Sequence, residues 1–210
     1  QIANQLINQS LPLLKNLFWK KLKIMNLTNN IKFINFNFKS SKKKVQKITT
    51  KLLKEENYIL KSLGSLYKDS YSKKKIQKVL RYSNVVIIGM GGSILGARSI
   101  YNFLKHKIKK NFFFIDNIEN INIKNFLNKK RLNLIISKSG NTLETIVNSN
   151  ILINQKHKNI FITENKENYL RNFAKNLRSE IINHNNYIGG RYSVLSEVGM
   201  VPAELMGLSV

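Results

Sequence analysis

The stretch VVIIGMGGSILG, residues 85–96, decides the fold of this sequence. Four consecutive apolar residues, Val85 to Ile88, form a run of strand length, and the glycines that follow allow a sharp turn. A short apolar strand, a glycine turn and a helical segment in this order are typical of a parallel sheet buried on both faces. The stretch therefore predicts the first strand, loop and helix of an α/β domain.

The same pattern recurs downstream. Further apolar runs occupy residues 112–115, 134–136 and 160–162, and we expect a fifth strand near 180–182. Segments with helical spacing lie between them, at 97–104, 121–127, 143–153 and 166–177. This alternation predicts a parallel five-stranded sheet covered by helices on both faces. Ligands of such sheets bind beyond the carboxyl ends of the strands.

The residues before this domain carry no chemical motif. We expect residues 1–83 to form a helical N-terminal arm, with apolar residues at helical spacing in 45–53 and 59–66, and residues 84–210 to form the α/β domain. Residues 1–24 precede the first methionine, Met25, and are either part of a native arm or upstream sequence. We expect the domain to be shortened at its C-terminal end, leaving apolar surface exposed around 194–208.

Composition excludes several classes of protein. The chain has 210 residues, 42% of them hydrophobic, and no cysteine, which excludes disulfide scaffolds, cysteine-ligated metals and thiol nucleophiles. No apolar run reaches the ~18 residues of a membrane span. The net charge of +25 has two interpretations, a polyanion-binding surface or AT-rich codon usage. Because only six of the 36 basic residues are arginine, we favour codon usage and expect no specific nucleic-acid partner and no membrane partner.

Three loops contain the chemistry. The first, residues 89–96, lacks the third glycine of a dinucleotide fingerprint because position 94 is Ile, and it lacks the lysine of a P-loop. It is either an anion-binding turn or a tight strand–helix turn without a ligand. The second, SKSGNTLET at residues 137–145, has four hydroxyls, a lysine and a glycine before a helix. This composition favours a phosphate cradle over simple helix capping by Asn141 or Thr142.

The third loop is GGRYSVLS, residues 189–196. Paired glycines can present the lone Arg191 on exposed backbone, aimed into a cleft. The alternative is a surface turn with a solvated arginine. The three histidines, His106, His157 and His184, fall in no catalytic motif, and we interpret them as surface or packing residues.

Together, the three loops resemble the phosphoglucose isomerase (glucose-6-phosphate isomerase) family of SIS-type sugar isomerases. The string GGRYSVLSEVG, residues 189–199, is a signature of that family rather than of SIS domains at large. The resemblance covers about Val85 to Val210. It implies a SIS-type, flavodoxin-like sheet, with residues 84–210 as the first sugar-phosphate-binding domain.

The resemblance also implies roles for individual residues. The groups expected to bind the substrate phosphate are Ser137, Lys138, Ser139, Thr142, Gly92 and Ser93. Arg191 would stabilise the negative charge of an enediolate intermediate. The residues expected to support the site are Thr145, Glu144 and Gly190. Glu144 has an equally plain interpretation as a carboxylate at a helix N-terminus.

The implied reaction interconverts glucose 6-phosphate and fructose 6-phosphate through a cis-enediol, without a metal or a cofactor. We expect a cytoplasmic homodimer at full length. The family's base glutamate, histidine and lysine follow the third loop beyond residue 210, so we expect the 210-residue chain alone to be inactive. Two alternatives remain open, a stand-alone phosphosugar-sensing domain and a dual glucose/mannose phosphate isomerase.

Overall fold

A computed structural model describes residues 26–28, 31–32, 42–55, 57–62, 67–118 and 130–210 of the chain. The contacts divide the chain into two units, residues 1–57 and 58–210. The first unit contains an antiparallel pair, β1 (Asn26–Thr28) with β2 (Ile31–Lys32), and the helix α2 (Lys42–Lys54). The sequence predicts the helix but not the pair, because strands of three and two residues are too short for a detectable alternation.

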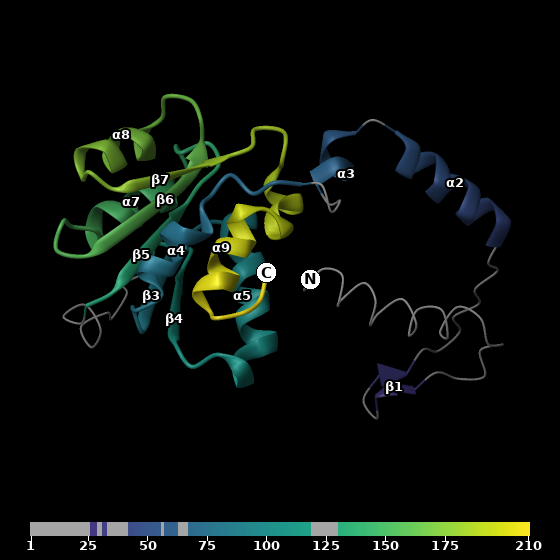
Figure 1. Ribbon diagram of the computed structural model, residues 1–210, viewed down its shortest axis with the longest axis horizontal. Helices are drawn as coiled ribbons and strands as arrows, with labels where there is room; N and C mark the ends of the chain where they lie inside the picture. The colour runs from purple at the N-terminus through teal and green to yellow at the C-terminus, as the bar shows by residue number, and fades with distance from the viewer. Residues whose placement is uncertain (1–25, 29–30, 33–41, 56, 63–66, 119–129) are drawn as a thin grey trace. The chain divides into compact units, whose positions relative to one another are not determined.

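The second unit is an α/β domain (Figure 1). Its strands are β3 (Asn84–Gly89), β4 (Asn111–Ile115), β5 (Leu132–Ile136), β6 (Lys158–Glu164) and β7 (Glu180–His184). Its α-helices are α3 (Tyr58–Ser62), α4 (Lys73–Val79), α5 (Gly92–Leu104), α7 (Leu143–Leu152), α8 (Tyr169–Asn176) and α9 (Glu197–Leu205). Two 3₁₀ helices, η1 (Lys105–Lys107) and η2 (Gly190–Leu195), complete the described elements.

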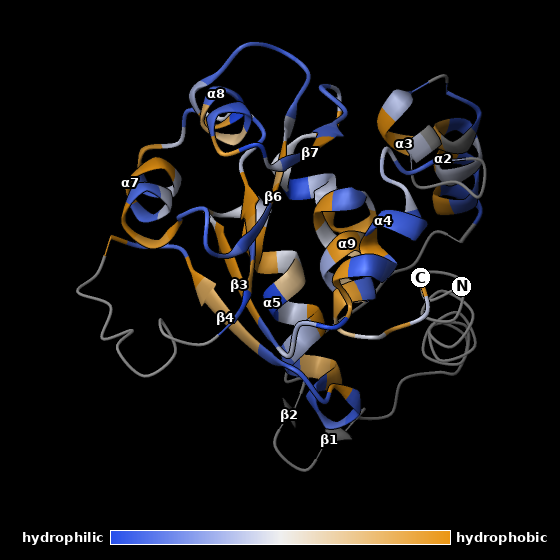
Figure 2. Ribbon diagram, turned by 60° about the vertical axis from the view of Figure 1, so that its left-hand side comes forward, coloured by the Kyte–Doolittle hydropathy of each residue, from blue (hydrophilic) through white to orange (hydrophobic). Residues whose placement is uncertain are grey.

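The strands form one parallel sheet in the order β4-β3-β5-β6-β7. All five predicted strands are confirmed, and so is the doubly covered sheet, because α7 and α8 lie on one face while α4, α5 and α9 lie on the other (Figure 2). The helix predicted at residues 121–127 lies outside the described residues. α8 begins three residues later than the sequence pattern predicts, because the Asn168 side chain caps it by accepting from the Arg171 N–H.

Alternation along the central strand fills two hydrophobic cores. Val85 and Ile87 of β3 face the helices α4, α5 and α9, whereas Val86 and Ile88 face α7 and α8. All four side chains are buried, which explains why the sequence has a continuous apolar run rather than a polar–apolar alternation.

The C-terminal helix corrects one expectation. Most apolar residues of the 194–208 segment are buried rather than exposed, because α9 packs its apolar face onto the sheet. The buried apolar side chains there are Val198, Met200, Val201, Ala203, Leu205 and Met206. Only Val194 of this segment is an exposed large hydrophobic residue, at 37%.

Candidate functional site

The three loops all leave the carboxyl ends of strands of the same parallel sheet. The first follows β3, the second follows β5, and the third belongs to the segment 185–196, which connects β7 to α9. The first two begin side by side because Gly89 of β3 is paired with Ile136 of β5. A Cβ atom at Gly89 would lie 2.8 Å from the Ile136 carbonyl oxygen. Glycine is therefore needed at the end of β3, where the first loop begins.

The first and third loops are in contact at two glycines. A Cβ atom at Gly92, the first residue of α5, would lie 2.7 Å from Gly190 Cα and closer still to its carbonyl group. The Ser193 hydroxyl, buried at this junction, donates to the carbonyl oxygens of Gly190 at 2.7 Å and Gly92 at 3.3 Å. The close approach of the two backbones therefore requires glycine at residue 92, whereas a Cβ atom at Gly190 would lie an ordinary 3.6 Å from Gly92 Cα.

The second loop is held by its own hydroxyls. Ser137 Oγ and Thr142 Oγ1 are 2.9 Å apart and share one hydrogen bond, and Ser137 Oγ also accepts from the Gly140 N–H. Ser139 Oγ accepts from the Asn141 N–H at 3.3 Å. Gly140 adopts a positive φ of 67°, and α8 covers it, since the Leu170 N–H donates to its carbonyl oxygen. The loop is thus rigid, yet Ser139 remains exposed and Thr142 half-buried.

The helix that follows the second loop starts without a side-chain cap. Thr142 occupies the N-cap position of α7 but makes no capping hydrogen bond. The Asn141 side chain accepts instead from the Tyr169 N–H at the start of α8. Capping of α7 by either residue, the alternative left open by the sequence, is therefore wrong. The first N–H groups of α7 have no intrahelical acceptor, and they lie directly beside the loop hydroxyls.

Two other residues of α7 were singled out by sequence. Glu144 lies half-buried in the first turn, as expected for an acidic residue at a helix N-terminus. Thr145 is 1% exposed, and its hydroxyl has no hydrogen-bond partner among the described residues. Its place directly behind the loop fits a supporting role through packing.

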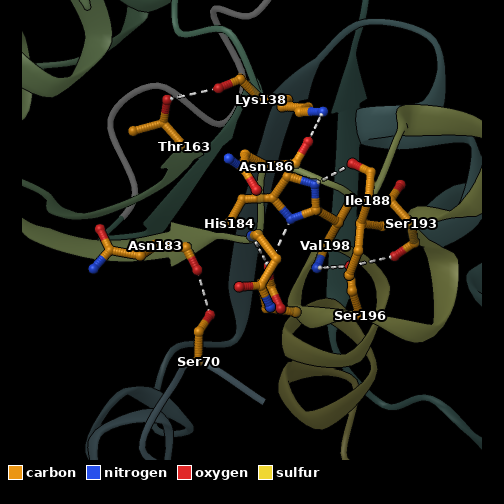
Figure 3. Close-up of polar contacts among 12 residues, drawn as sticks. Ser70, Lys138, Thr163, Asn183, His184, Asn186, Ile188, Ser193, Ser196 and Val198 are labelled. Carbon is orange, nitrogen blue, oxygen red and sulfur yellow. Dashed lines mark hydrogen bonds and ion pairs between the residues drawn. The ribbon is translucent and has the colours of Figure 1, made fainter. Parts of the chain in front are cut away.

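Lys138 connects the second loop to the third. Its ammonium group donates to the carbonyl oxygen of Asn186, while its own carbonyl accepts from the Glu164 N–H and the Thr163 hydroxyl (Figure 3). The side chain is half-buried in this position. Sequence reasoning placed Lys138 at the phosphate; the structure adds a contact with the arginine-bearing segment.

Arg191 lies in η2 with an exposed side chain. Within the described part of the chain, no hydrogen bond or ion pair engages its guanidinium group. Ser93 lies in the first turn of α5, where its N–H donates to the Met90 carbonyl. The structure thus brings the first, second and third loops together at one end of the sheet, and the Arg191 side chain is exposed to solvent there.

Sequence reasoning missed a buried polar network beside the third loop. His184, at the end of β7, contacts Glu197 through Nδ1 at 2.6 Å and the Ile188 carbonyl oxygen through Nε2 at 3.0 Å (Figure 3). Tyr67 OH donates to the other Glu197 oxygen at 3.0 Å, and the Asn185 side chain donates to Tyr67 OH. His184 and Glu197 are 3% and 0% exposed, so His184 is not a surface residue.

The hydrogen bonds define the charge of this network. Ile188 O can only accept, so Nε2 of His184 carries a proton. Glu197 accepts from the Asn185 N–H and from the Tyr67 hydroxyl, and both bonds favour its carboxylate form. Burial opposes ionisation of Glu197, but the bonds from His184 and Tyr67 outweigh it and hold the pKa of Glu197 below its usual range. Burial and the Glu197 charge raise the pKa values of Tyr67 and Asp69.

A cavity of about 420 Å³ lies apart from the three loops. It is lined by α5 and β4, including Arg98, Tyr101 and Phe114, and no residue of the three loops contributes to its wall. No group of three acidic, histidine or cysteine residues that could hold a metal occurs in the described ranges. None of the helices among the described residues combines the length and apolarity needed to cross a membrane.

Comparison with known proteins identifies the family. The model of the family described as phosphoglucose isomerase matches residues 39–209, so the chain belongs to that family. The glucose-6-phosphate isomerase of Methanocaldococcus jannaschii is 37% identical over 147 residues, which cover 65% of this chain and 36% of that protein. That of Mycoplasma genitalium is 32% identical over 145 residues, covering 62% and 34%. The chain spans about a third of the length of these curated relatives.

Solved structures agree at the level of the fold. A hypothetical protein of Thermus thermophilus matches with a TM-score of 0.59 at 23% identity, over 80% of this chain and 46% of that one. A candidate phosphosugar isomerase of Bacteroides fragilis, involved in capsule formation, matches with a TM-score of 0.51 at 18% identity, over 80% and 93%. At these identities the likeness establishes a shared SIS-type fold.

Proposed function

We propose that this member of the phosphoglucose isomerase family takes part in the aldose–ketose interconversion of glucose 6-phosphate and fructose 6-phosphate. In this reaction the sugar ring opens and a proton moves between C2 and C1 through a cis-enediolate. The chain contributes the phosphate cradle and the arginine that stabilises the enediolate. In this reaction these residues need only bind the substrate and stabilise negative charge, and no metal or cofactor is required.

One observation carries the proposal: α7 begins without a side-chain cap, directly after a loop that contains the hydrogen-bonded hydroxyls of Ser137 and Thr142. The Ser137–Thr142 pair has two protons and uses one between its own oxygens, so one remains to donate to a ligand. Ser139 uses its oxygen as an acceptor and keeps its proton free. Free donors at the positive end of a helix suit a phosphate dianion.

The remaining roles follow from position. Lys138 adds positive charge and a backbone N–H to the cradle, while Gly92 and Ser93 close it from the side of α5. Arg191, a permanent cation on exposed backbone, reaches the reacting end of the sugar and stabilises negative charge there. Thr145, Glu144 and Gly190 support the two loops without touching the reacting atoms.

The cradle is tested by binding of inorganic phosphate and of fructose 6-phosphate to the chain, measured by calorimetry. Ser139→Ala and Thr142→Val remove one charge-assisted hydrogen bond each, and we expect each to weaken both ligands by on the order of 10-fold or more. Ser99→Ala, at an exposed serine of α5 outside the loops, is the control and should bind both ligands normally. Equal binding by all variants would place the phosphate elsewhere.

The arginine is tested with 6-phosphogluconate, whose carboxylate imitates the charge of an enediolate. Arg191→Gln should weaken the binding of 6-phosphogluconate by on the order of 10-fold and leave the binding of inorganic phosphate unaffected. The reason is that only 6-phosphogluconate reaches the arginine. A phosphosugar sensor without catalysis predicts no preference for the carboxylate-bearing ligand. We further propose a cytoplasmic location and homodimerisation of the full-length enzyme, the latter tested by light scattering.

A further inference from the structure

The proposed role of Arg191 requires that its backbone be held in place, and Ser193 within the loop supplies only part of that support. The segment 185–196 contains two adjacent glycines, Gly189 and Gly190, which have more conformational freedom than other residues. Arg191 and Tyr192 are exposed and provide little packing, and Tyr187, also exposed, contacts the Tyr58 ring at 5.5 Å between centroids. Within the segment, the buried Ser193 bonds to the Gly190 carbonyl, but the backbone before the glycines is held by groups outside the segment, at Asn186 and Ile188.

The two residues of the buried His184–Glu197 pair flank that segment, one at each end. His184 is the last residue of β7 and Glu197 is the first residue of α9, so their 2.6 Å contact closes the base of the loop. The same imidazole reaches into the loop and donates from Nε2 to the Ile188 carbonyl, one residue before the paired glycines. The same carboxylate accepts from the Asn185 N–H, the first amide of the loop.

Tyr67 extends this network to the chain before the sheet. Its hydroxyl donates to Glu197 and accepts from the Asn185 side chain, so it contacts both the closing pair and the loop. Among the described residues, the titratable groups that face the pair are Tyr67 itself and, at longer range, Asp69 and Tyr71. With every polar atom of the imidazole and carboxylate bonded, the network holds one geometry rather than several.

We infer that His184 and Glu197, joined by Tyr67, are positioning residues that fix the Ile188–Gly190 backbone and thereby aim Arg191 at the substrate. The inference rests on the proposed function for its catalytic consequence, but the ordering of the loop can be measured without a substrate. The imidazole acts through two distinct nitrogens: Nδ1 closes the loop and Nε2 orders its interior. The two contributions can be separated by substitution.

A matched pair of variants makes this separation. His184→Asn can keep a donor near the position of Nδ1, toward Glu197, and loses the bond to Ile188. His184→Gln can keep a donor near the position of Nε2, toward Ile188, and loses the bond to Glu197. We expect His184→Asn to raise hydrogen-exchange rates of the Ile188 and Tyr192 amides by on the order of 10- to 100-fold, and His184→Gln to raise them clearly less.

Amides of β5, remote from the loop, serve as the internal control. A purely structural role for His184 would raise exchange throughout the domain and equally in both variants, and that result would overturn the inference. If His184→Asn does not fold, Tyr67→Phe replaces it, because it keeps the ring and removes only the hydroxyl. It should raise exchange of Asn185 and Ile188 about 3- to 10-fold, and unchanged rates would overturn the inference as well.

Binding then tests the link to Arg191. His184→Asn should weaken the binding of 6-phosphogluconate and leave the binding of inorganic phosphate unchanged, as expected for Arg191→Gln. When the two substitutions are combined, His184→Asn should cause no further loss of affinity. If the two substitutions instead cause additive losses of affinity for 6-phosphogluconate, His184 does not act through Arg191. If the wild-type chain binds neither ligand, the proposed function fails, while the exchange comparison still decides whether the pair orders the loop.

Discussion

The contact between the first and third loops leaves no room for a side chain, and Gly92→Ala tests it most directly. A Cβ atom at residue 92 would lie 2.7 Å from Gly190 Cα, with the carbonyl group of Gly190 closer still. Ordinary contacts of a Cβ atom begin at 3.4 Å. The two backbones would therefore have to separate by roughly 0.7 Å or more, which stretches the Ser193 bond to the Gly92 carbonyl.

Two opposing effects set the magnitude. Forcing atoms into a packed junction costs about 1–3 kcal/mol. Alanine is a better helix former than glycine by at most about 1 kcal/mol, and Gly92 is the first residue of α5. The steric effect wins, and we expect a net loss of about 1–2 kcal/mol in the free energy of unfolding. For a chain of this size, the loss lowers the midpoint of thermal unfolding by roughly 2–8 °C.

Urea denaturation monitored by circular dichroism measures the loss, with Gly189→Ala as the matched control. The nearest atom to a Cβ at residue 189 is Tyr192 Cδ2 at 3.8 Å, and φ there is −73°, so alanine fits. This control should be neutral or stabilising by up to about 1 kcal/mol, because it reduces the entropy of the unfolded chain. If both variants unfold at the same urea concentration, the close approach of the two loops does not exist in solution.

Three further substitutions test the core, the second loop and the buried carboxylate. Phe161→Ala, at a 0% exposed ring packed edge-on against Phe173, should cost about 3–5 kcal/mol in urea denaturation. Gly140→Ala combines a φ of 67° with a Cβ atom 2.8 Å from Asn168 Nδ2; it should cost about 2 kcal/mol or more and abolish phosphate binding in calorimetry. The lowered pKa of Glu197 contributes stability that is present above its usual value of 4.5 and is lost as pH falls through the lower value in the folded state. The stability difference between wild type and Glu197→Gln should therefore shrink below pH 4.5, and a constant difference from pH 7 to 3 would contradict the assignment.

The sheet and the loops were predictable because their information is local. Continuous apolar runs such as 85–88 indicate strands buried on both faces, and glycines after a strand mark the loop that follows it. The same local patterns identified five strands in the correct order along the chain. They also identified the three loops that the structure assembles at one end of the sheet.

The buried network was not predictable in this way. His184 and Glu197 are 13 residues apart, belong to different elements and form no recognisable spacing, and their partner Tyr67 precedes the sheet entirely. A histidine at the end of an apolar strand is as consistent with simple packing as with a buried ion pair. The alternative that Thr142 caps α7 was wrong for a related reason, because whether a hydroxyl caps a helix depends on competing partners that only the folded chain supplies.

The third loop differs from the other two in where it starts. β7 is an edge strand, and β6 and β5 lie between it and β3, so the segment 185–196 must cross about three strand spacings, roughly 14 Å, to reach Gly92. Lys138, His184 and Ser193 hold this crossing, and each donates to a backbone carbonyl: Asn186, Ile188 and, for Ser193, Gly190 and Gly92. Anchoring through the backbone leaves the side chains of Tyr187, Arg191 and Tyr192 exposed. A loop that must present an arginine to a ligand needs this combination, a fixed main chain with free side chains.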